Sequence, residues 1–97
     1  MNEIYSVSQL KSRMLPVFSE YNIRRAVLFG SYSKNCATAS SDIDLLVDSG
    51  LRGLKFVALQ DRLQTALEKD VDLFDVTHII PGSAIDREIH STGVDLL

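Results

Sequence analysis

Two short stretches decide how this 97-residue chain folds: residues 26–31 read AVLFGS, and residues 41–47 read SDIDLLV. The first is an apolar run that stops at a glycine and a serine, which is typical of a buried strand followed by a turn. The second alternates acidic and apolar side chains before it becomes fully apolar, which predicts a strand with one acidic and one apolar face. Because only ten residues separate Ser31 from Asp42, we expect the two strands to be neighbours.

The remaining apolar residues place helices and a third strand around this pair. We expect a helix over residues 8–21, capped by Ser6 or Ser8. Pro16 falls inside that helix and should kink it or open it locally. The other expected elements are strands over 23–29, 43–47 and 71–76, helices over 54–68 and 83–90, a short helix over 31–35, and an edge strand over 94–97. This order predicts an α/β (α+β) fold, a small mixed sheet with helices packed on it, in a single domain over residues 1–97.

Composition narrows the class of protein. Hydrophobic residues make up 45% of the chain and charged residues 24%, as in ordinary globular domains. The formal net charge is −3, whereas proteins that bind nucleic acids are more often basic, so we do not expect direct nucleic-acid binding. With one cysteine, Cys36, an internal disulfide and a cysteine-rich zinc site are excluded. The absence of a signal-like start and of a long apolar run favours a cytoplasmic protein without membrane contact.

Three aspartates are candidate metal ligands. Asp42 and Asp44 lie two residues apart on a predicted strand, so both side chains point to one face. Carboxylates this close repel each other unless a cation or a proton compensates, and oxygen ligands are those that Mg²⁺ prefers. Asp72 is the best third ligand, because its neighbours Val71 and Leu73 fit the core and turn Asp72 outward. Asp75 has the opposite parity and should not reach the same point.

The turn after the first strand is a candidate phosphate site. Gly30 would let a phosphate approach the backbone, and Ser31 offers a hydroxyl and an amide at the start of a helical turn. Lys34 supplies a cation nearby. A metal site beside such a phosphate cradle is what nucleotidyl transfer requires. The plainer alternatives are an ordinary turn, a helix cap and a solvated lysine.

Residues 28–31 (LFGS) and 41–45 (SDIDL) together resemble the signature of the DNA polymerase β-type nucleotidyltransferase superfamily, and the short chain is similar to its minimal branch, the MNT domains. The resemblance implies the nucleotidyltransferase fold, two Mg²⁺ ions, and ATP or another nucleoside triphosphate as substrate. It also implies metal binding by Asp42, Asp44 and Asp72, with Asp72 acting in addition as the base. Many minimal members are antitoxins paired with a HEPN-domain toxin, and some transfer AMP to a tyrosine of that toxin. At the position where such domains often carry an arginine, this chain has Lys34.

We therefore expect a Mg²⁺-dependent enzyme that transfers a nucleoside monophosphate, AMP in the first instance, to a hydroxyl of a HEPN-type protein partner. In this hypothesis Ser31 and nearby amides hold the β- and γ-phosphates. Two alternatives remain open. The chain could be an antitoxin that neutralises its partner by masking it without catalysis, or a domain that senses a nucleotide. An Asp42→Asn variant that still protects cells from the toxin would favour masking.

Overall fold

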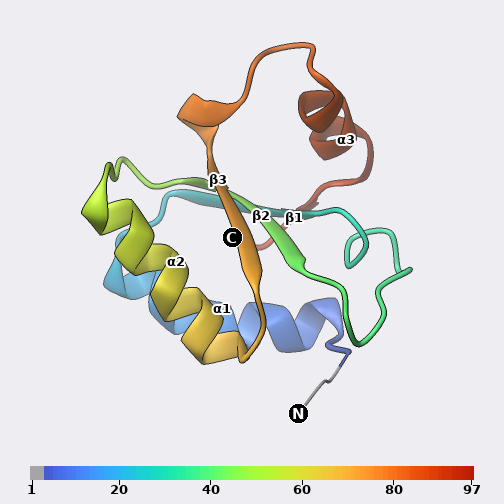
Figure 1. Ribbon diagram of the computed structural model, residues 1–97, viewed down its shortest axis with the longest axis horizontal. Helices are drawn as coiled ribbons and strands as arrows, with labels where there is room; N and C mark the ends of the chain where they lie inside the picture. The colour runs from blue at the N-terminus through green and yellow to red at the C-terminus, as the bar shows by residue number, and fades with distance from the viewer. Residues whose placement is uncertain (1–3) are drawn as a thin grey trace.

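One mixed sheet with helices on both faces forms the molecule in the computed structural model, which describes residues 4–97 (Figure 1). The strands are β1 (Arg25–Phe29), β2 (Ile43–Asp48), β3 (Val71–Asp75) and β4 (Val94–Asp95). The helices are α1 (Val7–Glu20), α2 (Leu54–Leu67), the 3₁₀ turn η1 (Val76–His78) and α3 (Ala84–Thr92). The predicted fold class is confirmed, and so is the predicted order of the elements apart from the short helix expected over residues 31–35.

The strands lie side by side in the order β3-β2-β1-β4. β1 is antiparallel to β2 and to β4, whereas β2 and β3 are parallel. α1 and α2 cover one face, and α3 lies on the other (Figure 1). The main core lies under α1 and α2, where alternate residues of β2, Ile43, Leu45 and Val47, are fully buried. Because alternate side chains of a strand point to opposite faces, Asp44 is turned toward the α3 face, where it is half-buried.

α1 begins as one of the two predicted caps requires. The Ser6 hydroxyl accepts from the backbone N–H of Gln9 at 3.1 Å, and the Gln9 side chain accepts from the Ser6 N–H at 2.8 Å. This reciprocal pair satisfies two backbone donors at the helix start. The helix continues through Pro16 to Glu20, and it buries Leu10, Met14, Val17 and Phe18.

From the sequence, Leu54 and Val57 are expected to belong to the apolar face of α2 together with Leu59, Leu63 and Leu67, and this expectation is wrong at the first turn. Leu54 and Val57 are 87% and 56% exposed, whereas the buried side chains are Leu59, Leu63 and Leu67. With 3.6 residues per turn, Val57 lies about 200° around the helix from Leu59, so the two cannot face the same core. The four-residue spacing of the leucines defines the stripe that packs on the sheet.

Residues 31–35 form turns rather than the short helix expected from the sequence. The N–H of Lys34 donates to Gly30 O at 3.2 Å, and the N–H of Cys36 donates to Ser31 O at 3.0 Å. Asn35 has a positive φ of 57°, which ends the helical progression. In the part of the chain that the structure describes, no helix is both long and apolar enough to cross a membrane.

Candidate active site

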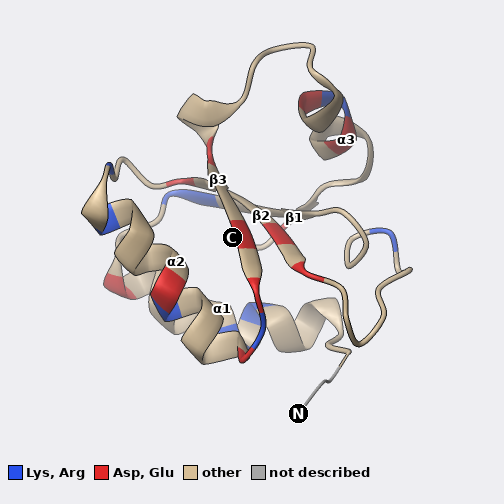
Figure 2. Ribbon diagram, in the orientation of Figure 1, with Lys and Arg blue, Asp and Glu red and all other residues tan. Residues whose placement is uncertain are grey.

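The acidic residues gather where the parallel strands β2 and β3 begin. Asp44 of β2 is in register with Asp72 of β3, and Asp42 lies one residue before β2. Figure 2 shows these acidic segments side by side in the middle of the view. Asp42 and Asp72 are exposed and Asp44 is half-buried. As the parity argument from the sequence predicted, Val71 and Leu73 are buried and Asp72 is not, whereas the register of Asp72 with Asp44 follows from the pairing of β2 with β3.

Asp44 is the most perturbed acid of the group. Burial raises its pKa to about 6, and the neighbouring carboxylate of Asp72 adds to the shift, with smaller effects of Glu88 and Asp42. Such a set favours a proton or a cation, so its donor chemistry fits Mg²⁺. Within residues 4–97, however, no three acidic, histidine or cysteine side chains converge as a ready-made metal site. The three-ligand set of Asp42, Asp44 and Asp72 therefore stays a prediction.

Without metal, Asp44 should destabilise the fold at neutral pH. Its folded pKa of about 6 exceeds the ordinary 3.8, so the folded protein binds more protons than the unfolded chain between these values. The protonated Asp44 side chain contributes stability that is fully present below pH 3.8 and is lost as the pH rises through about 6. We expect Asp44→Asn to raise the free energy of unfolding by about 1 kcal/mol at pH 8, a figure discounted for solvent screening at a half-exposed site.

This prediction is checked by urea unfolding in chelator at pH 4 and pH 8. Asp95→Asn, an exposed aspartate on β4 at the opposite edge of the sheet, is the matched control and should change little at either pH. A gain for Asp44→Asn that is equal at pH 4 and pH 8 would contradict the prediction, because the protonated acid costs nothing at pH 4.

Gly30 follows β1 directly and lies against the side chain of Asp44. Its φ is +77°, and a Cβ at this position would overlap Oδ2 of Asp44 and lie 3.0 Å from Asp44 Cγ. The absence of a side chain at residue 30 therefore makes room for the Asp44 carboxylate. The sequence suggested another reason for this glycine, the approach of a phosphate, and that role stays a prediction, as does the role of half-buried Ser31.

Lys34 is engaged by a residue that the sequence did not single out. Its ammonium donates to Glu88 Oε1 of α3 at 2.8 Å, and this bond and charge raise the pKa of Lys34. Glu88 also contributes to the raised pKa of Asp44, so the ion pair lies beside the acidic group. The partners are 54 residues apart, and no local pattern could have indicated Glu88. A contact of Lys34 with phosphate stays a prediction.

Asp75 does not join the site, as its parity predicted. It is buried on the opposite face from Asp72, where Ser49 and Thr77 each donate a backbone N–H and a hydroxyl to its carboxylate. Although burial raises its pKa, these hydrogen bonds outweigh burial and lower it to about 2. Through these hydrogen bonds the Asp75 carboxylate connects the loop after β2 to η1.

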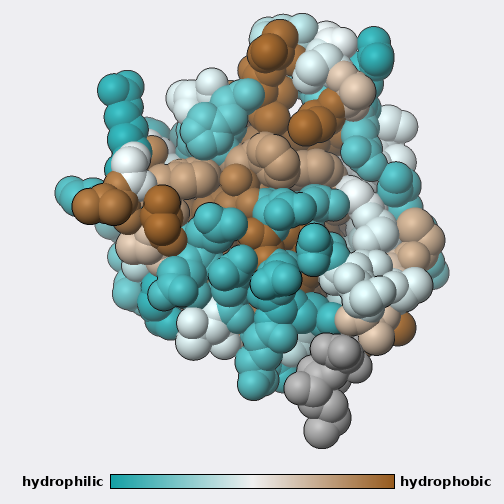
Figure 3. All heavy atoms as spheres, viewed as in Figure 1, coloured by the Kyte–Doolittle hydropathy of each residue, from teal (hydrophilic) through white to brown (hydrophobic). Residues whose placement is uncertain are grey.

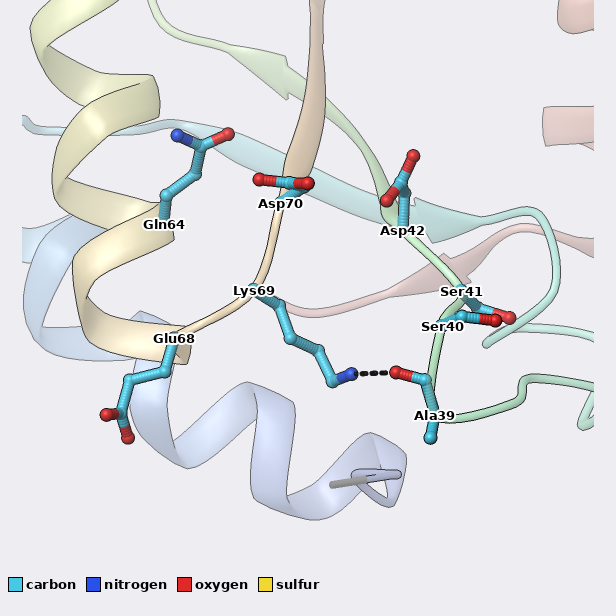
Figure 4. A pocket seen from close by; sticks show the side chains of 8 residues that line it. All are labelled: Ala39, Ser40, Ser41, Asp42, Gln64, Glu68, Lys69 and Asp70. Carbon is cyan, nitrogen blue, oxygen red and sulfur yellow. Dashed lines mark hydrogen bonds between the residues drawn. The ribbon is translucent and has the colours of Figure 1, made fainter. Parts of the chain in front are cut away.

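A polar cavity of about 490 Å³ adjoins the acidic group on the side of β3. It lies between the segment before β2 and the connection from α2 to β3, and Asp42 is part of its wall (Figure 4). Lys69 crosses one side of it and donates to Ala39 O at 2.9 Å. No local pattern in the sequence indicated this cavity, because its walls come from segments about 25 residues apart, which the parallel β2–β3 pair brings together.

The chain is similar to known proteins in sequence and in fold. The family model described as polymerase beta, nucleotidyltransferase matches residues 13–97. A Methanocaldococcus jannaschii protein named "Putative protein adenylyltransferase MJ0435" is 32% identical over 94 residues, which cover 95% of this chain and 99% of that protein. A crystal structure described as a toxin-antitoxin with AMP-PNP superposes with a TM-score of 0.74 at 26% identity, over 90% of this chain and 72% of that one.

A further solved structure shares the fold. A tri-AMPylated Shewanella oneidensis HEPN toxin in complex with MNT antitoxin gives a TM-score of 0.68 at 24% identity, over 94% of this chain and 71% of that one. The family match covers most of the chain, and it includes both β1 with its terminal glycine and the acidic starts of β2 and β3. The chain belongs to the polymerase beta nucleotidyltransferase family.

Proposed function

We propose that this protein transfers AMP from ATP to a hydroxyl of a HEPN-type protein partner and thereby acts as an antitoxin. The observation that carries the proposal is the pairing of Asp44 with Asp72 directly beside the turn at Gly30. Relatives named as protein adenylyltransferases and a fold shared with antitoxins of HEPN toxins support the choice of AMP and of partner. A location in the cytoplasm, expected from the sequence, is part of the same proposal.

Mg²⁺ ions, two in the expected stoichiometry, would be held by Asp42, Asp44 and Asp72. When bound, Mg²⁺ supplies charge neutralisation for the carboxylates and for the phosphates of ATP. The half-buried position of Asp44 and its elevated pKa fit this role, because a cation would remove the repulsion that its ionised form meets.

The chain's own groups perform the other tasks. Amides of the turn after Gly30 and the Ser31 hydroxyl hold the β- and γ-phosphates, and Lys34 exchanges its contact with Glu88 for one with phosphate. Asp72 accepts the proton of the acceptor hydroxyl. The hydroxyl oxygen then forms a bond to the α-phosphorus, the bond between the α-phosphorus and the bridging oxygen breaks, and pyrophosphate leaves with the electron pair.

Intact-mass analysis tests the proposal. The product of the adjacent gene is incubated with this protein, ATP and Mg²⁺, and we expect its mass to rise by one or more AMP units. A reaction without ATP, and one with the Asp42→Asn variant, serve as controls and should leave the mass unchanged. Protection of cells by Asp42→Asn, together with an unmodified partner, would reject catalysis in favour of masking.

A further inference from the structure

The place of the phosphate cradle determines where the acceptor must enter. β2 lies between β1, whose end carries Gly30 and Ser31, and β3. If the turn after β1 holds the β- and γ-phosphates, pyrophosphate departs on the β1 side of the acidic residues. In phosphoryl transfer the attacking and leaving oxygens lie roughly in line with the phosphorus. The acceptor hydroxyl must therefore arrive from the β3 side.

The polar cavity lies between the segment that precedes β2 and the segment that precedes β3, so it adjoins Asp42 on the side of β3. Its wall includes Asp42 from the segment before β2 and Asp70 from the segment before β3 (Figure 4). Gln64 of α2 forms part of the far wall, and its side-chain carbonyl accepts from the N–H of Val71 at 3.1 Å. The contact of Lys69 with Ala39 joins the two sides. The walls of the cavity are therefore already held in place in this structure.

The charge of the cavity wall is unfavourable for binding a phosphate group there. Its wall carries the carboxylates of Asp42, Glu68 and Asp70 against the single ammonium of Lys69, which is already bonded to a backbone carbonyl. Figure 3 shows the same region as a hydrophilic surface below the middle of the view. With Asp42 engaged by Mg²⁺ as proposed, Glu68 and Asp70 still leave an excess of one negative charge over Lys69, which repels a triphosphate and attracts a positively charged side chain. A volume of about 490 Å³ admits a few side chains rather than a folded element.

We propose that this cavity, bounded by residues 39–42 and 68–70 together with Gln64, receives the acceptor segment of the protein substrate, in which a lysine or arginine flanks the modified hydroxyl. The inference rests on the proposed AMP transfer and names the chemistry of its acceptor. Asp70, which is exposed and two residues from Asp72, pairs with the basic side chain and sets the specificity for the acceptor.

A charge reversal tests this assignment. Asp70→Lys is compared with wild type and with Asp95→Lys, which makes the same change at the opposite edge of the sheet. AMP transfer to the product of the adjacent gene is followed at varied concentrations of that protein, and Mg²⁺-dependent ATP binding is measured separately by calorimetry. Because Asp70 is exposed, the variant should fold, and the milder Asp70→Asn provides a second, smaller step.

We expect Asp70→Lys to raise the KM for the protein acceptor at least about tenfold, with kcat and ATP affinity close to wild type. Asp70→Asn should give a smaller rise, and Asp95→Lys none. An unchanged KM in Asp70→Lys overturns the acceptor site while the proposed function stands. A fall in ATP affinity by the same factor as the rise in the KM for the acceptor also overturns it, because the cavity would then bind the nucleotide. A wild-type protein that transfers no AMP rejects the proposed function itself, and the acceptor site with it.

Discussion

Replacing Asp72 by Asn is expected to lower AMP transfer at least about 100-fold, the usual scale of general-base catalysis, while ATP still binds. The side chain is exposed and in register with Asp44, so the change removes a charge from the site without opening a cavity in the core. Transfer is measured with labelled ATP and a purified acceptor, and the fold is checked by the urea midpoint. Asp95→Asn is the control for the loss of one surface carboxylate.

A well-folded Asp72→Asn protein with wild-type rates would place the base elsewhere. Asp75 is unsuited to replace it, because its carboxylate is buried on the other face and is occupied by Ser49 and Thr77. Asp48 is also unsuited, since it lies at the far end of β2 and pairs with Arg24 at 3.4 Å. The remaining candidates for the base are therefore the acidic residues near Asp72 at the start of β2 and β3.

The sequence predicted those features that depend on local periodicity. Alternation along residues 41–47 and 71–75 placed Asp44 and Asp72 on one face and Asp75 on the other, because a strand turns every second side chain to the same side. The capping serine before α1 was likewise readable, since the cap and its partner lie three residues apart. Both signals lie within a few residues of the position that they predict.

Features that depend on distant contacts could not be predicted in this way. The pairing of Lys34 with Glu88 joins the turn after β1 to α3, and the cavity beside Asp42 joins two chain segments through the sheet. The exposure of Leu54 and Val57 follows from how α2 lies on the sheet, which the composition of the helix alone does not determine. In each case the sheet order, and not a motif, brings the residues together.

Gly30→Ala should weaken Mg²⁺-dependent ATP binding at least about tenfold, a loss of roughly 1.4 kcal/mol or more. The new methyl group would overlap the Asp44 carboxylate, which must turn away from the position where it faces Asp72. A positive φ of 77° adds backbone strain of about 1–2 kcal/mol for any residue with a side chain. Gly30→Val, with a branched Cβ, should lose the folded state more severely than Ala.

Gly82→Ala separates the two effects. Gly82 has a φ of +80°, almost that of Gly30, but a Cβ there meets nothing within 4 Å. Both alanine variants should therefore lose similar stability from strain, whereas only Gly30→Ala should lose ATP affinity, measured by calorimetry with Mg²⁺. Equal ATP affinity in the two variants would show that Gly30 does not control the site.

A double-mutant cycle identifies Asp44 as the group that the methyl displaces. In an Asp44→Ala background the carboxylate is absent, so adding Gly30→Ala should cost stability by strain alone, as Gly82→Ala does, and should change ATP affinity no further. If Gly30→Ala weakens ATP binding by the same factor with and without the Asp44 carboxylate, the methyl group acts on the phosphates directly. The cycle thus decides whether this glycine serves the metal-binding aspartate or the nucleotide.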